Sequence, residues 1–256
     1  MPSNLPRAVQ EVAYERWAQE YLRSLPPEHF MEATGQATQR AITLESLALV
    51  QARRPEVHVF NELLVQYPIR GQRRPGQVVP DNMVVITDQR IRAGSSYNVP
   101  LEAARPFWVL EYVSKSNERK DYEDSFRKYE RGLKVPYYLV FYPGEGELTL
   151  FRHNKRKYVT VRPNERGRYA IPDLELELAL LDGWVRYWYQ GELLLLPGDL
   201  QRQLDQARRQ AEEARRQAEE ARRQAVEAKR RGDELQQRLE AAERELARLR
   251  SRAGEG

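Results

Sequence analysis

The sequence predicts a mixed α/β fold followed by a long C-terminal helix. Three observations support this prediction. Short apolar runs rich in β-branched and aromatic residues recur between turn-forming residues, which is typical of buried strands. Amphipathic helical patterns precede and separate these runs, and that order indicates a mixed central sheet flanked by helices. After Pro197 the composition changes to a charged, alanine-rich repeat with a helical period.

The elements follow one another in a clear order. Helices are expected at residues 8–24, 42–50 and 121–133, with Thr43 as the N-cap of the second. The apolar runs that predict strands or short sheet segments lie at residues 56–67, 78–86, 106–114, 137–141, 148–152, 157–161, 168–171, 174–181 and 184–189. Residues 70–77, rich in Gly, Pro and Arg, predict a loop.

The chain is expected to divide into a helical segment at residues 1–30, a folded domain at 31–196 and a coiled coil at 200–252. From Leu200 onward, small or apolar residues recur at alternating spacings of four and three, which is the heptad pattern. This seam is mostly alanine at first and mostly leucine from Leu235, so association should be tighter near the C-terminus. We expect a homo-oligomer, most simply a dimer; a solvated single helix held by charge pairs is the alternative.

Composition sets limits on the function. The chain has 256 residues and no cysteine, which excludes disulfides and thiolate zinc sites. No apolar run approaches the ~20 residues of a membrane span, and the first residues lack the apolar core of a signal peptide. We therefore expect a cytoplasmic protein with no membrane partner. The net charge is +4, but +3 of it falls in residues 200–256, so bulk charge gives the folded domain little support for binding nucleic acid.

Two predicted strands each contain an acid. Asp81 interrupts the run at residues 78–86, and Glu111 interrupts the run at 106–114. A buried acid is costly unless it is paired or binds a metal. If the two strands are neighbours, both carboxylates can converge on one hard cation such as Mg²⁺. The alternatives are a turn role for Asp81 and a buried ion pair for Glu111.

These residues resemble the Uma-two family of the PD-(D/E)xK nuclease superfamily. Pro80 and Asp81 match the first motif, and Glu111 matches its second acid. The further matches, in chain order, are the run from Glu111 to Ser116, then Asp121, Tyr129 and the run from Lys134 to Pro143. The resemblance covers roughly residues 30 to 190. It implies a restriction-endonuclease-like fold, DNA as the partner, and hydrolysis of phosphodiester bonds with Mg²⁺ or Mn²⁺.

The chain departs from the family at the catalytic lysine. The superfamily places this lysine two residues after the second acid, where the chain has Val113. The Uma-two family instead places it on the following helix, where the chain has Ser125. Lys128 lies three residues further along, on the same helical face, and is the expected replacement, with Lys120 as the second choice.

The resemblance then implies a role for each site residue. Asp81 and Glu111 hold the metal together with a carbonyl near Tyr112, and Lys128 orients or deprotonates the attacking water. Further candidates, in chain order, are Gln39, Glu62, Lys115, Lys120 and Tyr129. The displaced lysine and the near-neutral domain also motivate a second hypothesis. In that hypothesis the chain is a catalytically inactive scaffold or interaction protein that acts through its coiled coil.

Overall fold

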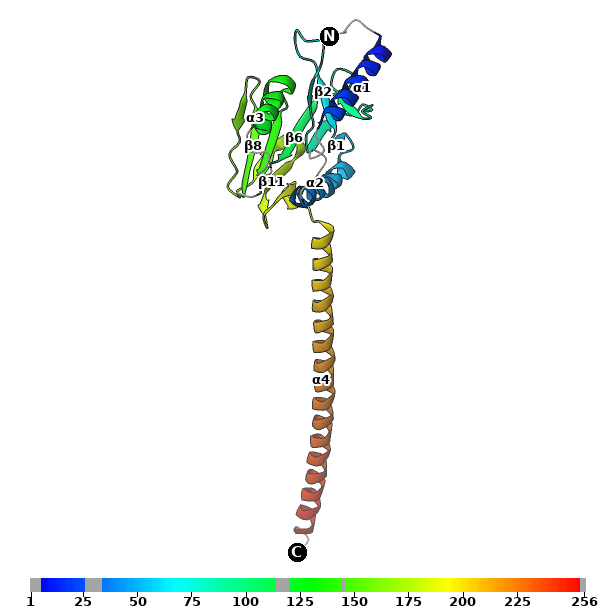
Figure 1. Cartoon of the computed structure of the whole chain (residues 1–256). Helices are drawn as coiled ribbons and strands as arrows, with labels where there is room; N and C mark the ends of the chain where they lie inside the picture. The colour runs from blue at the N-terminus through cyan, green and yellow to red at the C-terminus, as the bar shows by residue number, and fades with distance from the viewer. Residues whose placement is uncertain (1–5, 26–33, 114–119, 144–145, 254–256) are drawn as a thin grey trace. The chain divides into compact units, whose positions relative to one another are not determined.

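The computed structural model describes residues 6–25, 34–113, 120–143 and 146–253, with side chains described for all of these except 120–122 and 245–253. The chain divides into two compact units, residues 1–196 and 197–256. The first unit is a mixed α/β structure, and the second is a long helix (Figure 1). The predicted fold class, a mixed sheet flanked by helices and followed by a long C-terminal helix, is confirmed.

Helices and strands alternate along the first unit. Its helices are α1 (Arg7–Ser24), α2 (Thr34–Arg53) and α3 (Lys120–Arg127), with a π-helical turn η3 (Lys128–Leu133) directly after α3 and a 3₁₀ turn η4 (Pro172–Leu174). Its strands are β1 (Val57–Asn61), β2 (Leu64–Tyr67), β3 (Gly76–Val78), β4 (Asn82–Ile86), β5 (Ser96–Asn98), β6 (Pro106–Tyr112), β7 (Tyr137–Tyr142), β8 (Glu147–His153), β9 (Tyr158–Thr160), β10 (Tyr169–Ile171), β11 (Leu176–Leu181), β12 (Trp184–Tyr189) and β13 (Glu192–Leu193).

The main sheet has the strand order β1-β4-β6-β7-β8-β9. Strands β6 and β7 run parallel, and the other neighbours are antiparallel, so the sheet is mixed. The second sheet, β10-β11-β12-β13, is antiparallel, and the third has the order β3-β2-β5. Helix α2 contacts β1 of the main sheet and β12 of the second sheet, while α1 contacts β2 and β5.

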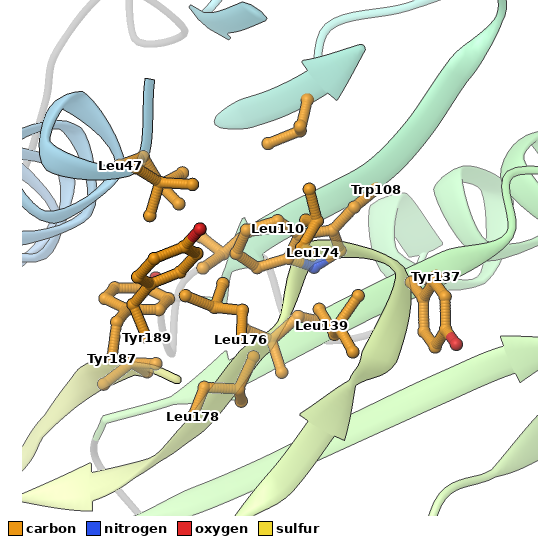
Figure 2. Packing of buried hydrophobic residues seen from close by; sticks show 14 of the residues in the cluster. Leu47, Trp108, Leu110, Tyr137, Leu139, Leu174, Leu176, Leu178, Tyr187 and Tyr189 are labelled. Atoms are coloured by element: carbon orange, nitrogen blue, oxygen red, sulfur yellow. The ribbon is translucent and has the colours of Figure 1, made fainter. Parts of the chain in front are cut away.

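Both faces of the main sheet are buried, which explains why its strands read as continuous apolar runs. Alternate residues of β6 face opposite sides: Trp108 and Leu110 belong to one core cluster, and Val109 belongs to the other. The first cluster lies between the main and second sheets. Figure 2 shows Leu110 and Leu139 gathered with Leu176 of the second sheet.

Two expectations about element boundaries were wrong. Helix α2 begins at Thr34, and Thr43 lies in its buried interior instead of capping its start. Its hydroxyl hydrogen-bonds to the Tyr187 hydroxyl at 2.9 Å, so a polar residue that resembles a cap has a tertiary partner. The single strand expected at residues 56–67 is two strands in different sheets. The chain turns between them at Glu62, whose φ of 49° breaks the extended run.

The second unit is the single helix α4 (Pro197–Ala253), and the long C-terminal helix is confirmed. Large apolar side chains along it are exposed, for example Leu235 at 65% and Leu239 at 61%. Of the helices in the part of the chain that the structure describes, none is long and apolar enough to cross a membrane.

Replacing Gly132 by alanine should destabilise the first unit. A Cβ at Gly132 would lie 2.4 Å from the buried ring of Tyr67, which Gly76 also approaches from β3. Overpacking of this kind typically costs about 1–3 kcal/mol. We expect a loss of that size in the free energy of unfolding, measured by urea titration followed by tryptophan fluorescence.

The matched control is Gly94→Ala, because a Cβ at Gly94 meets nothing within 4 Å. It should change the free energy of unfolding by less than about 0.5 kcal/mol. Equal stability of the two variants would contradict the close contact between Gly132 and Tyr67.

Candidate active site

Asp81 lies where three elements meet. It directly precedes β4, and its Oδ1 accepts a hydrogen bond of 2.8 Å from the Gln36 side-chain amide of α2. Its Oδ2 accepts a hydrogen bond of 2.6 Å from the main-chain N–H of Tyr112 at the end of β6. Because β4 pairs directly with β6, the acid before one strand lies beside the acid at the end of the other.

Glu111 is held from the opposite side. The Tyr129 hydroxyl donates a hydrogen bond of 2.5 Å to its Oε1, and the Tyr129 ring is fully buried. Tyr129 belongs to the π-helical turn η3, a type of turn that often occurs at functional sites. The carboxyl groups of Glu111 and Asp81 also lie close enough to act on each other, since the charge of Asp81 raises the pKa of Glu111. The structure therefore brings Asp81, Glu111, Tyr112 and Tyr129 together.

Burial governs the charge state of this carboxyl pair. It raises the pKa of Asp81 from 3.8 to about 6, against the lowering effect of hydrogen bonds from Tyr112, Glu111 and Gln36. The pKa of Glu111 is raised well above its ordinary value, first by burial and then by the negative charge of Asp81. Without a cation, burial and the neighbouring charge both favour the protonated form, because two adjacent carboxyls repel each other when both are ionised.

The carboxyl pair fits a divalent cation. Mg²⁺ is usually held by one or two carboxylates and completes its shell with water and substrate phosphate oxygens. A cation at this position would offset the charge repulsion that otherwise keeps a proton on the pair. Among the described residues, no group of three or more His, Cys, Asp and Glu side chains converges, so further ligands would be main-chain, water or substrate oxygens.

A small cavity of about 10 Å³ lies next to Asp81, with room for about one water molecule. Residues from α2, the β1–β2 turn and the ends of β4 and β6 line it, among them Gln36, Arg40, Glu62, Asp81, Asn82 and Tyr112. Asn82 is only 2% exposed, and neither polar atom of its amide has a hydrogen-bond partner within the described part of the protein. An unpaired buried amide indicates that the cavity holds a polar group.

Glu62, expected inside a strand, instead lies at the mouth of this cavity. Its carboxylate forms an ion pair with Arg40 at 3.1 Å, and its main-chain N–H donates to the Asp81 carbonyl at 3.2 Å. The negative charge of Glu62 also contributes to raising the pKa of Asp81. Glu62 is therefore a neighbour of the carboxyl pair.

The lysine candidates are not placed beside the carboxyl pair by any described contact. Lys128 forms an ion pair with Asp124 at 2.7 Å, one turn earlier on the helix. Ser125, at the family's lysine position, lies one turn before Tyr129. Lys115 lies outside the described residues, and Lys120 begins α3 with its side chain outside the described part.

Sequence reasoning missed Gln36, Arg40 and Asn82. The signal was present in α2, where Gln36, Arg40 and Thr43 recur at spacings of four and three and so share one helical face. Gln39, a further candidate, lines the cavity beside Asp81. Its buried amide also bonds both main-chain groups of Val185, accepting at 2.9 Å and donating at 3.2 Å, and so ties α2 to β12.

The first unit is a mixed α/β fold in which two acids meet at the ends of adjacent strands. This is the arrangement that the resemblance to restriction-endonuclease-like nucleases predicts. The family model Uma2, described as "Putative restriction endonuclease", matches residues 4–182. Because this match covers more than half of the chain, the protein belongs to the Uma2 family, which confirms the resemblance to Uma-two proteins.

One solved structure similar to this chain is the crystal structure of a "putative nuclease belonging to DUF820" from Anabaena variabilis ATCC 29413. The sequence identity is 13% and the TM-score is 0.42, over 56% of this chain and 75% of that chain. No curated protein matches the chain.

Replacing Glu111 by glutamine should flatten the pH dependence of stability in metal-free protein. A carboxyl whose pKa is higher in the folded than in the unfolded chain stabilises the fold below its unfolded pKa, and that contribution is lost as the pH rises toward the folded value. The pKa of Glu111 in the folded chain is raised well above its unfolded value of 4.5, so this contribution is lost as the pH rises above 4.5. From pH 5 to pH 7, the wild type should therefore lose more stability than Glu111→Gln, up to the limit of about 1.4 kcal/mol per pH unit for one proton.

Urea unfolding in EDTA across this pH range measures the difference. The control is Glu147→Gln, an exposed glutamate at the start of β8, which should leave the wild-type pH profile unchanged. Parallel profiles for the wild type and Glu111→Gln would show that Glu111 does not hold a proton in the folded chain.

Proposed function

We propose that this protein is a metal-dependent DNA endonuclease of the cytoplasm that hydrolyses phosphodiester bonds. The observation that carries the proposal is the half-buried pair of Asp81 and Glu111, which lies at the ends of adjacent strands in a member of a restriction-endonuclease family. The reaction joins a water oxygen to phosphorus and breaks one ester P–O bond. It leaves one phosphate end and one hydroxyl end.

Asp81 and Glu111 would hold Mg²⁺ or Mn²⁺, with the Tyr112 carbonyl as a further ligand. When bound, such an ion polarises the phosphate and lowers the pKa of a bound water. The Gln36 amide and the Tyr112 N–H fix the orientation of the Asp81 carboxylate, and the Tyr129 hydroxyl does the same for Glu111. Lys128, one residue before Tyr129, would orient or deprotonate the attacking water, for which it must leave Asp124.

Asp81→Asn should abolish both metal binding and cleavage. Asparagine keeps the shape of the side chain but removes the charge that a divalent cation requires. By titration calorimetry, the wild type should bind Mg²⁺ or Mn²⁺ and the variant should not. Cleavage of a duplex DNA substrate should fall by roughly 10³-fold, since metal activation supplies several kcal/mol to such reactions.

Asp88→Asn is the matched control, because Asp88 is an exposed aspartate just beyond the opposite end of β4. It should bind metal and cleave as the wild type does. Undiminished cleavage by Asp81→Asn would overturn the mechanism. A wild type that neither binds metal nor cleaves DNA would favour the inactive scaffold that acts through its C-terminal helix.

We also propose that α4 pairs with α4 of a second copy as a coiled coil, most simply in a dimer. The heptad seam runs along the helix, and its leucines Leu200, Leu204, Leu235 and Leu239 are 46–65% exposed in the single chain. A second copy would cover these side chains. Pairing would bring two nuclease units into one assembly, which suits cleavage of both strands of a duplex.

Leu239→Asp should convert the oligomer to a monomer, because it places a charge in the leucine-rich part of the seam. Val226→Asp is the control, since Val226 has nearly the same exposure, 63% against 61%, but lies off the seam. Analytical ultracentrifugation of the full chain measures the mass of each. A monomeric wild type, or equal dissociation of both variants, would count against the coiled coil.

A further inference from the structure

We propose that Arg40 of α2 is the phosphate-binding cation of this site and contacts a backbone phosphate of the DNA next to the carboxyl pair. The inference rests on the proposed nuclease function and adds to it a residue that the family motif does not include. It also identifies a residue that could supply positive charge near the scissile phosphate. The family's lysine position is occupied by Ser125, and Lys128 is paired with Asp124.

The helix geometry places Arg40 at the site. Gln36 and Arg40 are four residues apart and therefore share one face of α2. Gln36 bonds directly to the Asp81 carboxylate, and both residues line the cavity beside it. Among the described residues that line this cavity, Arg40 alone carries a positive charge.

One partner of Arg40, Glu62, shows what kind of group the guanidinium binds. Nη1 of Arg40 lies 3.1 Å from Oε1 of Glu62, and the two side chains are 28% and 45% exposed. A guanidinium presents a planar fork of donors that suits carboxylate and phosphate equally well. Ion pairs this exposed to water are weak, so a phosphate can displace Glu62 at little cost. In the absence of DNA, Glu62 holds Arg40 at the cavity mouth in place of the phosphate.

The cavity itself is built for a polar occupant. Asn82, adjacent to Asp81 in sequence, lines it with an amide that is buried and, within the described part of the protein, has no hydrogen-bond partner. A cavity used only for packing would be lined by apolar groups. A water molecule or ligand oxygen bound to Asn82 would lie beside Arg40 and Asp81, which line the same cavity.

The test measures duplex DNA binding by the full chain in an Asp81→Asn background, which leaves the DNA intact. Fluorescence anisotropy is recorded over a series of salt concentrations. Arg40→Gln should weaken binding about 10-fold at low salt and reduce the slope of log K against log salt by about 1, as expected for one lost phosphate contact. Glu62→Gln should instead strengthen binding a few-fold, because it removes the acid that competes with phosphate.

Two further variants separate this role from a structural one. Arg40→Lys keeps the charge but not the fork, so it should retain the salt slope with a smaller loss of affinity. Arg54→Gln breaks a comparable ion pair, Arg54 with Glu56 at 2.7 Å, just after the end of α2 and outside the cavity lining. It should bind DNA as the background protein does.

The outcomes distinguish the two proposals. If Arg40→Gln binds DNA as Arg54→Gln does, Arg40 has no phosphate contact. If Glu62→Gln weakens binding as much as Arg40→Gln, the ion pair is structural. Either result overturns the inference while wild-type cleavage stands. If neither the wild type nor the background protein binds duplex DNA, the nuclease function fails and the role of Arg40 fails with it.

Discussion

The site depends on one interaction, the direct antiparallel pairing of β4 with β6. The register sets Asn82 opposite Leu110, so the residue before β4 and the residue after Leu110 are neighbours. Both of those residues are acids, and both are half-buried. The contacts around them follow from this placement: Gln36 and the Tyr112 N–H hold Asp81, and Tyr129 holds Glu111. A slip of one residue in the register would turn one acid to the other face of the sheet and separate the pair.

Holding two carboxyls in this position opposes folding, and the rest of the first unit has to offset that cost. Core clusters cover both faces of the main sheet, and β6 contributes Trp108 and Leu110 to one and Val109 to the other. The parallel pairing of β6 with β7 fixes the end of β6 where Glu111 lies. A group that binds only the folded carboxyl pair would stabilise the fold by mass action, so the proposed cation would couple stability to function.

The sequence predicted the strands and the two acids because both are local signals: an apolar run bounded by turn formers, and a charge inside it. It did not predict the start of α2 or the turn at Glu62, because long-range partners decide both. In the sequence, Thr43 resembles a helix cap. In the structure, its hydroxyl hydrogen-bonds to the hydroxyl of Tyr187 from a strand far away in sequence. Gln36 was missed for the same reason, since its partner Asp81 is 45 residues away and nothing local marks a glutamine as the support of a carboxylate.

Different elements of the chain contact the two acids of the carboxyl pair. Tyr129 approaches Glu111 from η3, whereas Gln36 approaches Asp81 from α2 with Arg40 one turn beyond. At the position where the family motif has its lysine, the chain has Ser125. Phosphodiester hydrolysis, however, requires positive charge near the phosphate and does not require that charge to come from a particular element. In the proposed mechanism, a cation supplied by α2 could therefore replace the one missing at Ser125, because Gln36 of α2 contacts Asp81 and Tyr129 of η3 contacts Glu111.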